Sequence, residues 1–305
     1  RMSEKAAGLQ ARIDSGKPIL LVEVEPPKSG DAAPLRATAK RFAGKVDAIG
    51  LSDNRHGVCM SALAAAGIVA SEGLETILHI VTRDRNRIAL LAECLGAQAL
   101  GVRNIFCTSG THQTLGVCRP AKNVYDIDSI QLIDALTRLA EGSAVYPERF
   151  ESVGPFCLGA VAAPFADPME MQLIRLAKKL NAGARFLITQ PVYDIERFRA
   201  WWEQIEKRGL HERAAILACI QPLCDAAGAA VFASSRPSPL VPRELLDALS
   251  SAGDTQAQRE AGIGIALETI RQLSGLKGLR GFQICAEDDE SAALEIIERA
   301  GLGVR

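Results

Sequence analysis

Short apolar runs that alternate with amphipathic helical patterns predict an α/β fold, a TIM (β/α)8 barrel with a helical insertion after the seventh strand. The alternation continues through all 305 residues without a linker or a change in composition. Polar residues follow most of the apolar runs, as they do where barrel strands end. Together these observations favour a single TIM-barrel domain over residues 1–305.

The predicted strands are the apolar runs bounded by proline, glycine or polar residues. They cover residues 19–25, 46–51, 75–81, 104–107, 156–161, 186–190, 215–220 and 279–285. The helical patterns cover residues 33–42, 59–72, 127–140, 168–181, 195–207 and 290–300, and a further helix ends at residue 95. About eight βα units result, which is the number in a TIM barrel.

Two segments are longer than a simple connection requires. Residues 226–274 are too many for one crossover helix, and Pro237, Pro239 and Pro242 divide them into at least two helices and a turn. We expect this segment to be an insertion within the same domain. Residues 108–126 form a long loop after the fourth strand, and loops of that length in compact domains are usually functional.

The composition indicates a globular protein that binds a small molecule. With 48% hydrophobic and 23% charged residues the chain can bury a large core, and a formal net charge of -1 gives no electrostatic footprint for nucleic acid. No apolar run approaches the roughly 20 residues of a membrane span, and the charged N-terminus lacks the apolar core of a secretory signal, so we expect a cytoplasmic protein. The eight cysteines form no CxxC pair and no metal-ligand spacing with the four histidines, which predicts reduced thiols and no metal site.

The first predicted strand places carboxylates on one face. Because side chains alternate along a strand, Glu23 and Glu25 share a face with Ile19 and Leu21. A carboxylate in apolar surroundings is costly unless it is paired or used. The alternative is that both glutamates are solvated residues at the strand end, and the strand alone does not decide between these interpretations.

Polar residues at the ends of the other predicted strands complete the candidate site. The full set of candidates at the strand ends is Glu23, Glu25, Ser52, Asp53, His79, Thr111, Ala163, Gln190 and Glu287. His79 is either a hydrogen-bonded core residue or a ligand contact. Gln190 is either a loop cap or an amide that binds a heterocycle by donating and accepting together. Residues 52–54 favour an Asx turn that starts the next helix.

Several motifs occur in order along the chain: Val-Glu-Val-Glu-Pro-Pro at 22–27, Leu-Ile-Thr-Gln at 187–190 with Tyr-Asp at 193–194, the helix end at 178–184, and the insertion with Phe232 and a helix at 262–273. Together they resemble the methylenetetrahydrofolate reductase family over nearly the whole chain. Arg-Asp-Arg-Asn at 83–86 and residues 121–129 are most similar to forms of the family from acetogenic and other anaerobic bacteria.

The resemblance implies a flavin-dependent oxidoreductase of one-carbon metabolism and methionine biosynthesis. It would reduce 5,10-methylenetetrahydrofolate to 5-methyltetrahydrofolate, or catalyse the reverse oxidation, with Glu23 as the general acid that assists opening of the methylene bridge. The implied cofactor is FAD, with FMN as an alternative. Electrons would come from NAD(P)H or from a partner subunit, and the chain is expected to form a homo-oligomer.

Further site residues are transferred from the family by position. The implied folate contacts are Gln190, Phe232, Thr111 and Tyr193. The implied flavin contacts are Ser52, His79, Gly110, Thr111, Ala163 and Lys179. Lys179 would offer its positive charge to a phosphate of the cofactor.

The sequence departs from the family pattern at two of these positions. Residues 109–111 read Ser-Gly-Thr where the family has a Gly-Asp pair, so Thr111 replaces an acid close to the flavin and the folate. Ala163 stands where the family has a tyrosine. Two alternatives stay open. One is a methyltransferase that binds methyltetrahydrofolate, because that chemistry also uses barrels and needs a folate site without a flavin. The other is a flavin-free, non-catalytic homologue that acts as a partner subunit, which the changes at Thr111 and Ala163 would predict.

Overall fold

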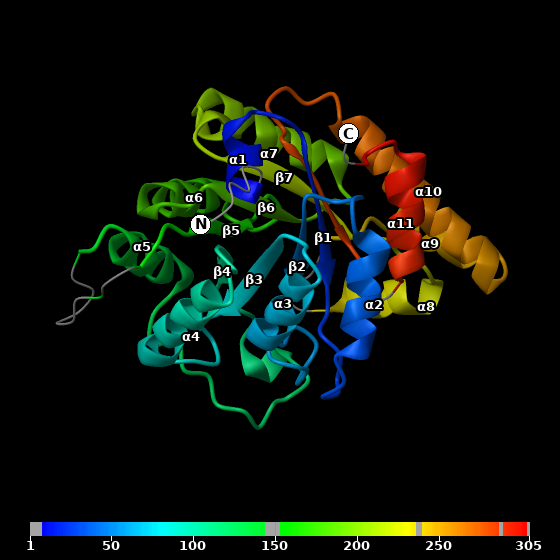
Figure 1. The fold of residues 1–305 in the computed structure, drawn as a ribbon. Coiled ribbons are helices and arrows are strands. Elements are labelled where there is room, and N and C mark those ends of the chain that lie inside the picture. Colours follow the sequence, from blue (N-terminus) through cyan, green and yellow to red (C-terminus); the bar gives the residue numbers. More distant parts are fainter. Residues whose placement is uncertain (1–7, 144–149, 151–152, 236–239, 287–288, 304–305) are drawn as a thin grey trace.

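The strands form a closed barrel. The computed structural model describes residues 8–143, 150, 153–235, 240–286 and 289–303. Within them eight parallel strands pair in chain order, and β1 pairs with both β2 and β8 (Figure 1). The strands are β1 (Ile19–Val24), β2 (Ala48–Leu51), β3 (Thr76–Val81), β4 (Asn104–Thr108), β5 (Cys157–Ala162), β6 (Phe186–Pro191), β7 (Ala215–Ile220) and β8 (Gly281–Cys285). The predicted TIM-barrel fold is confirmed, whereas the extent of the domain over all 305 residues stays a prediction.

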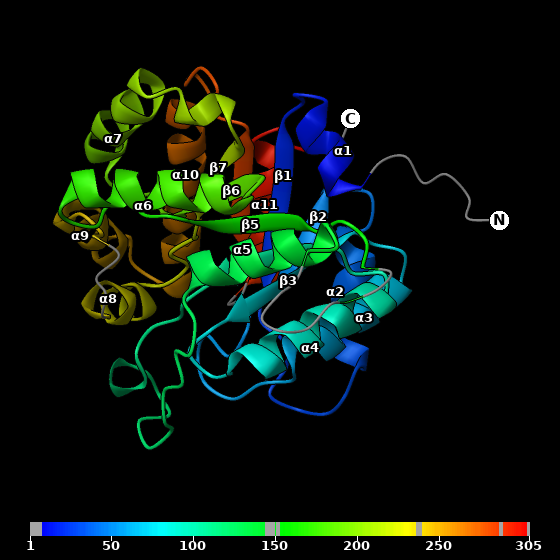
Figure 2. The same cartoon turned by 90° about the vertical axis from the view of Figure 1, so that its left-hand side faces the viewer.

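Helices cover the outside of the barrel, as Figures 1 and 2 show from two sides. Those that follow the strands are α2 (Ala33–Phe42), α3 (Ala62–Ser71), α4 (Arg87–Ala99), α5 (Ser129–Ala140), α6 (Met169–Ala182), α7 (Ile195–Lys207), α10 (Thr255–Leu273) and α11 (Glu290–Arg299). They pack on outward-facing strand residues in one core, to which β1 contributes Leu20, Val22 and Val24. In the described parts of the chain, no helix has the length and apolar character needed to cross a bilayer.

A second core fills the barrel interior. Ile19 and Leu21 of β1 belong to it, and because side chains alternate along the strand, Glu23 points to the same interior. The short helix α1 (Leu9–Asp14), which the sequence analysis did not predict, adds its apolar residues to this core and closes the amino-terminal end of the barrel. In Figure 1, α1 lies at the opposite end of the barrel from α8.

The segment after β7 forms three helices. The predicted insertion consists of α8 (Ala226–Ser234) and α9 (Arg243–Ser251), whereas α10 returns to the barrel and packs into the outer core. Pro242 is the N-cap residue of α9, and the other two prolines predicted to divide the segment, Pro237 and Pro239, lie outside the described residues.

Two helices begin later than predicted, each for a local reason. Helix α3 begins at Ala62 rather than at residue 59, because the side chain of Asn54 accepts the N–H of Cys59 at 3.3 Å and holds that segment as a loop. Helix α5 begins at Ser129 rather than at residue 127, because Asp128 and Gln131 form a reciprocal capping box.

Candidate active site

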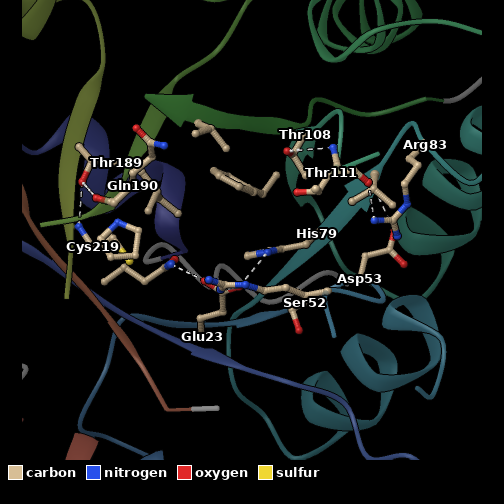
Figure 3. A pocket seen from close by; sticks show the side chains of 18 residues that line it. Glu23, Ser52, Asp53, His79, Arg83, Thr108, Thr111, Thr189, Gln190 and Cys219 are labelled. Carbon is tan, nitrogen blue, oxygen red and sulfur yellow. Dashed lines mark hydrogen bonds and ion pairs between the residues drawn. The ribbon is translucent and has the colours of Figure 1, made fainter. Parts of the chain in front are cut away.

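A pocket opens among the carboxyl ends of the barrel strands (Figure 3). Its cavity measures about 300 Å³. The predicted site residues in its lining are Glu23, Ser52, Asp53, His79, Gly110, Thr111 and Gln190. The structure therefore brings together side chains that the sequence spreads over most of its length. Glu287, another strand-end candidate, lies outside the described residues.

Glu23 is a buried, paired carboxylate and not a solvated strand-end residue. Only 6% of it is exposed. Its Oε1 lies 3.2 Å from Nη1 of Arg55 and 3.7 Å from Nδ1 of His79, and its Oε2 accepts a hydrogen bond from Nε2 of Gln283 at 2.6 Å. Glu25 is half-buried beyond the end of β1 and does not belong to the described pocket lining. The two glutamates are therefore not equivalent.

His79 is placed against the pocket by the residues on either side of it. Its ring packs on Phe106, with centroids 4.7 Å apart. A Cβ atom at Gly50 of β2 would lie 2.7 Å from Nε2 of His79, so only a glycine leaves room for the imidazole. His79 is 5% exposed and lines the cavity, so the interpretation as a ligand contact stays a prediction.

The structure corrects the interpretation of Asp53 as part of an Asx turn. Its carboxylate accepts the N–H of Val81 at 2.9 Å and pairs with Arg85 at 2.7 and 3.1 Å, so it joins β2 to the segment after β3. Asp53 is 3% exposed, and a buried carboxylate is stabilised by such charged partners. Ser52 beside it lines the pocket, and its buried hydroxyl has no hydrogen-bond partner among the described residues.

The Arg-Asp-Arg-Asn segment holds the loops at the pocket mouth. Arg83 donates to the carbonyl of Thr111 at 3.1 Å and to that of Asn54 at 3.4 Å, and pairs with Asp84 at 2.7 Å. Burial alone would raise the pKa of Asp84, but the hydrogen bonds from Arg83 leave that pKa below its ordinary value. Asn86 accepts the N–H of Ala89 and caps α4.

Gly110 and Thr111 lie beside this arginine. Gly110 has a φ of +76°, and a Cβ there would lie 3.2 Å from Cβ of Arg83, so the turn requires glycine. Thr111 contributes a neutral side chain to the lining. The acids in the described lining are Glu23 and Asp53, and each is already paired with an arginine.

A bulge in β6 shapes the segment that carries Gln190. The pairing register with β7 shifts between Ile188 and Pro191. Within the bulge, the hydroxyl of Thr189 accepts the N–H of Cys219 at 3.0 Å and donates to the carbonyl of Gln190 at 2.8 Å. The amide oxygen of Gln190 accepts the N–H of Phe165 at 3.2 Å, so the side chain caps a loop while it lines the pocket.

The remaining predicted residues lie outside the described lining of this cavity. Lys179 donates its ammonium group to the carbonyl of Val161 at 2.6 Å, and burial lowers its pKa to about 8. Tyr193 donates to the carbonyl of Gln221 at 2.8 Å and packs edge-on against Phe232, with ring centroids 6.1 Å apart. Ala163 follows the last residue of β5.

The sequence did not predict five polar residues of the lining: Arg55, Arg83, Thr108, Thr189 and Gln283. A usable signal existed for Gln283, because it is a polar residue between Phe282 and Ile284 in an apolar run. Arg55 reaches the pocket from the loop after β2, and no periodicity indicates where such a residue points. Among the described residues, no group of three or more His, Cys, Asp or Glu is arranged to hold a metal ion.

The fold and the site define a TIM-barrel protein with a buried acid and further polar side chains around a pocket at the strand ends. The family model described as methylenetetrahydrofolate reductase matches residues 8–301. The chain belongs to that family.

Named relatives carry the same family description. Methylenetetrahydrofolate reductase 1 of Schizosaccharomyces pombe is 27% identical over 152 residues, which are 48% of this chain and 24% of that protein. A probable methylenetetrahydrofolate reductase (NADPH) of Caenorhabditis elegans is 23% identical over 251 residues, 80% of this chain and 35% of that protein. The matched region is thus about a quarter to a third of the length of these relatives.

Solved structures show the same fold. A protein from Clostridium thermocellum, described as binding two copies of 5-methyl-5,6,7,8-tetrahydrofolic acid, superposes with a TM-score of 0.68 at 13% identity and covers 96% of this chain and 99% of its own. Oxaloacetate acetylhydrolase superposes with a TM-score of 0.52 at 14% identity, covering 96% of this chain and 84% of its own. At these identities the similarity concerns the fold alone.

Proposed function

We propose that the chain reduces 5,10-methylenetetrahydrofolate to 5-methyltetrahydrofolate, or catalyses the reverse oxidation, with a bound flavin. The observation that carries the proposal is Glu23, a buried carboxyl group at the position of the family's acid that faces a cavity at the barrel mouth. The methyltetrahydrofolate bound by the structural neighbour from Clostridium thermocellum supports a folate ligand.

The proposed reaction needs one proton and one hydride. The bond between the bridging methylene carbon and N10 of the folate breaks, and its electron pair goes to N10, which takes a proton from Glu23. The methylene carbon, now part of a 5-iminium cation, accepts the hydride and becomes the methyl group. A reduced flavin, when bound, supplies that hydride.

Glu23 can donate this proton only in its protonated form. Arg55, whose Nη1 lies 3.2 Å from Oε1, favours the carboxylate. We infer that Arg55 turns from Glu23 toward another acceptor when the ligands are bound, which leaves Glu23 free to carry the proton. A carbonyl of the pterin or of the flavin ring is such an acceptor.

The lining fits the polar edge of a flavin ring. The buried Ser52 hydroxyl, which has no partner among the described residues, would gain one from that edge, with His79, Gly110 and Thr111 on the same side of the pocket. We propose FAD in preference to FMN, with Ala163 and Lys179 toward its phosphates. Lys179 would have to leave the carbonyl of Val161 to reach a phosphate.

The folate would occupy the other side of the pocket. Gln190 already has its amide oxygen engaged by the loop, so its amide nitrogen remains to donate to the pterin. Tyr193 and Phe232, which pack together beyond the lining, would contact the part of the folate outside the cavity. We further propose NAD(P)H or a partner subunit as electron source, a homo-oligomeric assembly, a cytoplasmic location and a role in methionine biosynthesis.

The test combines a spectrum with two glutamine variants. The purified protein should show flavin absorption, and Glu23→Gln should lower folate turnover by about 10² to 10⁴-fold while reduction of the flavin by dithionite is unchanged. Glu25→Gln, at the same strand end but outside the described lining, is the matched control and should remain active. An active Glu23→Gln variant, or a colourless protein that no flavin reconstitutes, would overturn the proposal.

One observation keeps a second candidate in view. Thr111 gives the pocket a neutral side chain where the family has an acid, as expected for a folate-binding methyltransferase or a partner subunit without flavin. Membership of the reductase family does not favour either alternative. A colourless preparation that binds methyltetrahydrofolate tightly and transfers its methyl group to an acceptor would favour the methyltransferase.

A further inference from the structure

Gln283 lies directly beside the proposed acid. It is 2% exposed, and its Nε2 donates to Oε2 of Glu23 at 2.6 Å. Resting on the function proposed above, we propose that Gln283 is the positioning residue of Glu23, and that its amide turns over when Glu23 changes its protonation state.

The amide group can serve both states of the acid. It carries two N–H donors on one side and a carbonyl acceptor on the other. Toward the ionised Glu23 it presents the donor, as the structure shows. Once Oε2 carries a proton, two donors would face each other, and half a turn of the amide brings its oxygen to accept the O–H. Glu23 is then held in one orientation before and after it gives up the proton.

A buried oxygen atom without a hydrogen-bond partner supports the second orientation of the amide. The amide oxygen of Gln283 is buried and has no hydrogen-bond partner among the described residues. Buried acceptors are normally bonded, and one left without a partner calls for an explanation. In the turned orientation this oxygen accepts the proton of Glu23, so it has its partner in the state that carries out the reaction.

The backbone of Gln283 is fixed by the barrel. Strand β8 lies between β7 and β1, and Gln283 is in register with Cys219 on one side and Leu21 on the other. Its neighbours Phe282 and Ile284 belong to the outer core, which keeps Gln283 facing inward. The amide can therefore turn about its own bond but cannot move away from Glu23.

The other groups that face Glu23 do not provide the same pair of contacts. Arg55, from the loop after β2, has donors only and suits the carboxylate alone. His79 of β3 is 3.7 Å from Oε1, and Cys285 of β8 places its sulfur 3.9 Å from Oε2. Gln283 makes the shortest of these contacts, which is why we assign the positioning role to it.

The experiment replaces Gln283 with leucine, which has a similar size and no hydrogen-bonding groups. Asn104→Leu is the matched control. Asn104 is also a buried amide that donates to a glutamate carboxylate, and its Nδ2 lies 2.7 Å from Oε1 of Glu75. It lies at the start of β4, outside the pocket lining. Gln283→Leu should lower kcat/KM for the folate about 10²-fold and shift its pH profile. Asn104→Leu should lower stability but leave the profile in place.

A second readout does not depend on turnover. The infrared C=O band of protonated Glu23, identified by its loss in Glu23→Gln, should move to higher frequency in Gln283→Leu, because the carboxylic acid loses its acceptor. This shift tests Gln283 even if the wild-type protein does not reduce the folate. If the leucine variant does not fold, Gln283→Glu has the same shape, and its pH profile should move upward because two carboxyl groups then share a proton. An unchanged band and profile would show that Gln283 is only a structural residue.

Discussion

Replacing Arg55 with glutamine should shift the pH dependence of the reaction. Nη1 of Arg55 lies 3.2 Å from Oε1 of Glu23. Coulomb's law at that separation gives about 5 kcal/mol for an effective dielectric constant near 20 and about 1 kcal/mol in bulk water. The Arg55 side chain is 33% exposed, so solvent screening places the net effect near the lower value, about 1 to 2 kcal/mol or about one pH unit.

The sign follows from the charge that is removed. Without the guanidinium, the ionised form of the acid loses its counter-charge, and the alkaline fall of kcat/KM should move up by about one unit in Arg55→Gln. The measurement is the pH profile of folate turnover with chemically reduced protein under anaerobic conditions. Arg55→Lys retains the charge and should follow the wild-type profile closely. If the Arg55→Gln and wild-type profiles superimpose, the ion pair does not control the acid and the reasoning is refuted.

Three further substitutions test other parts of the structure. Asp53→Asn removes one of the two carboxylates that pair with the half-buried Arg85, the other being Glu93, and should lower the free energy of unfolding in urea by about 2 kcal/mol. Asp167→Asn, at an exposed ion pair, should cost less than about 1 kcal/mol. Gly50→Ala places a Cβ 2.7 Å from an imidazole nitrogen and should weaken folate binding about tenfold in calorimetry, while Gly264→Ala, with no atom within 4 Å of the new Cβ, should not. Burial lowers the pKa of Lys179 from 10.5 to about 8. Between these two pH values the unfolded chain binds a proton that the native protein lacks, so the free energy of unfolding should rise across this range by about 3 kcal/mol. Urea unfolding at both ends of that pH range should show a smaller rise in the free energy of unfolding for Lys179→Met than for the wild type. An equal rise in the two proteins would contradict the buried placement of this lysine.

The sequence was sufficient for the fold because parallel strands buried on both faces read as apolar runs. Alternation along the first strand also predicted that Glu23 faces the interior, since Leu21 faces it too. Helix α1 escaped notice because it is short, with Leu9 and Ile13 as its buried residues. It packs against the amino-terminal end of the barrel interior, a surface that exists only once the strands have paired into a barrel.

The surroundings of the acid depend on tertiary geometry that no local pattern contains. Arg55 reaches Glu23 through a loop in which Asn54 adopts a left-handed φ of 50°. Asp53 pairs with Arg85, 32 residues further along the chain, so its partner could not be read from the turn in which it lies. Lys179 donates to the carbonyl of Val161 in β5, a contact that depends on the position of α6 and that no local pattern predicts.

Because the amino-terminal end of the barrel is closed, reactants can reach the pocket from one side. Helix α1 and the interior core fill the barrel on the amino-terminal side of Glu23, so the pocket is reached through the rim where the strands end. On the proposed function, the electron donor and the folate both react in this cavity, so both would approach through the same opening. The rim loops held by Arg83 lie at that opening and would contact each reactant as it enters and leaves.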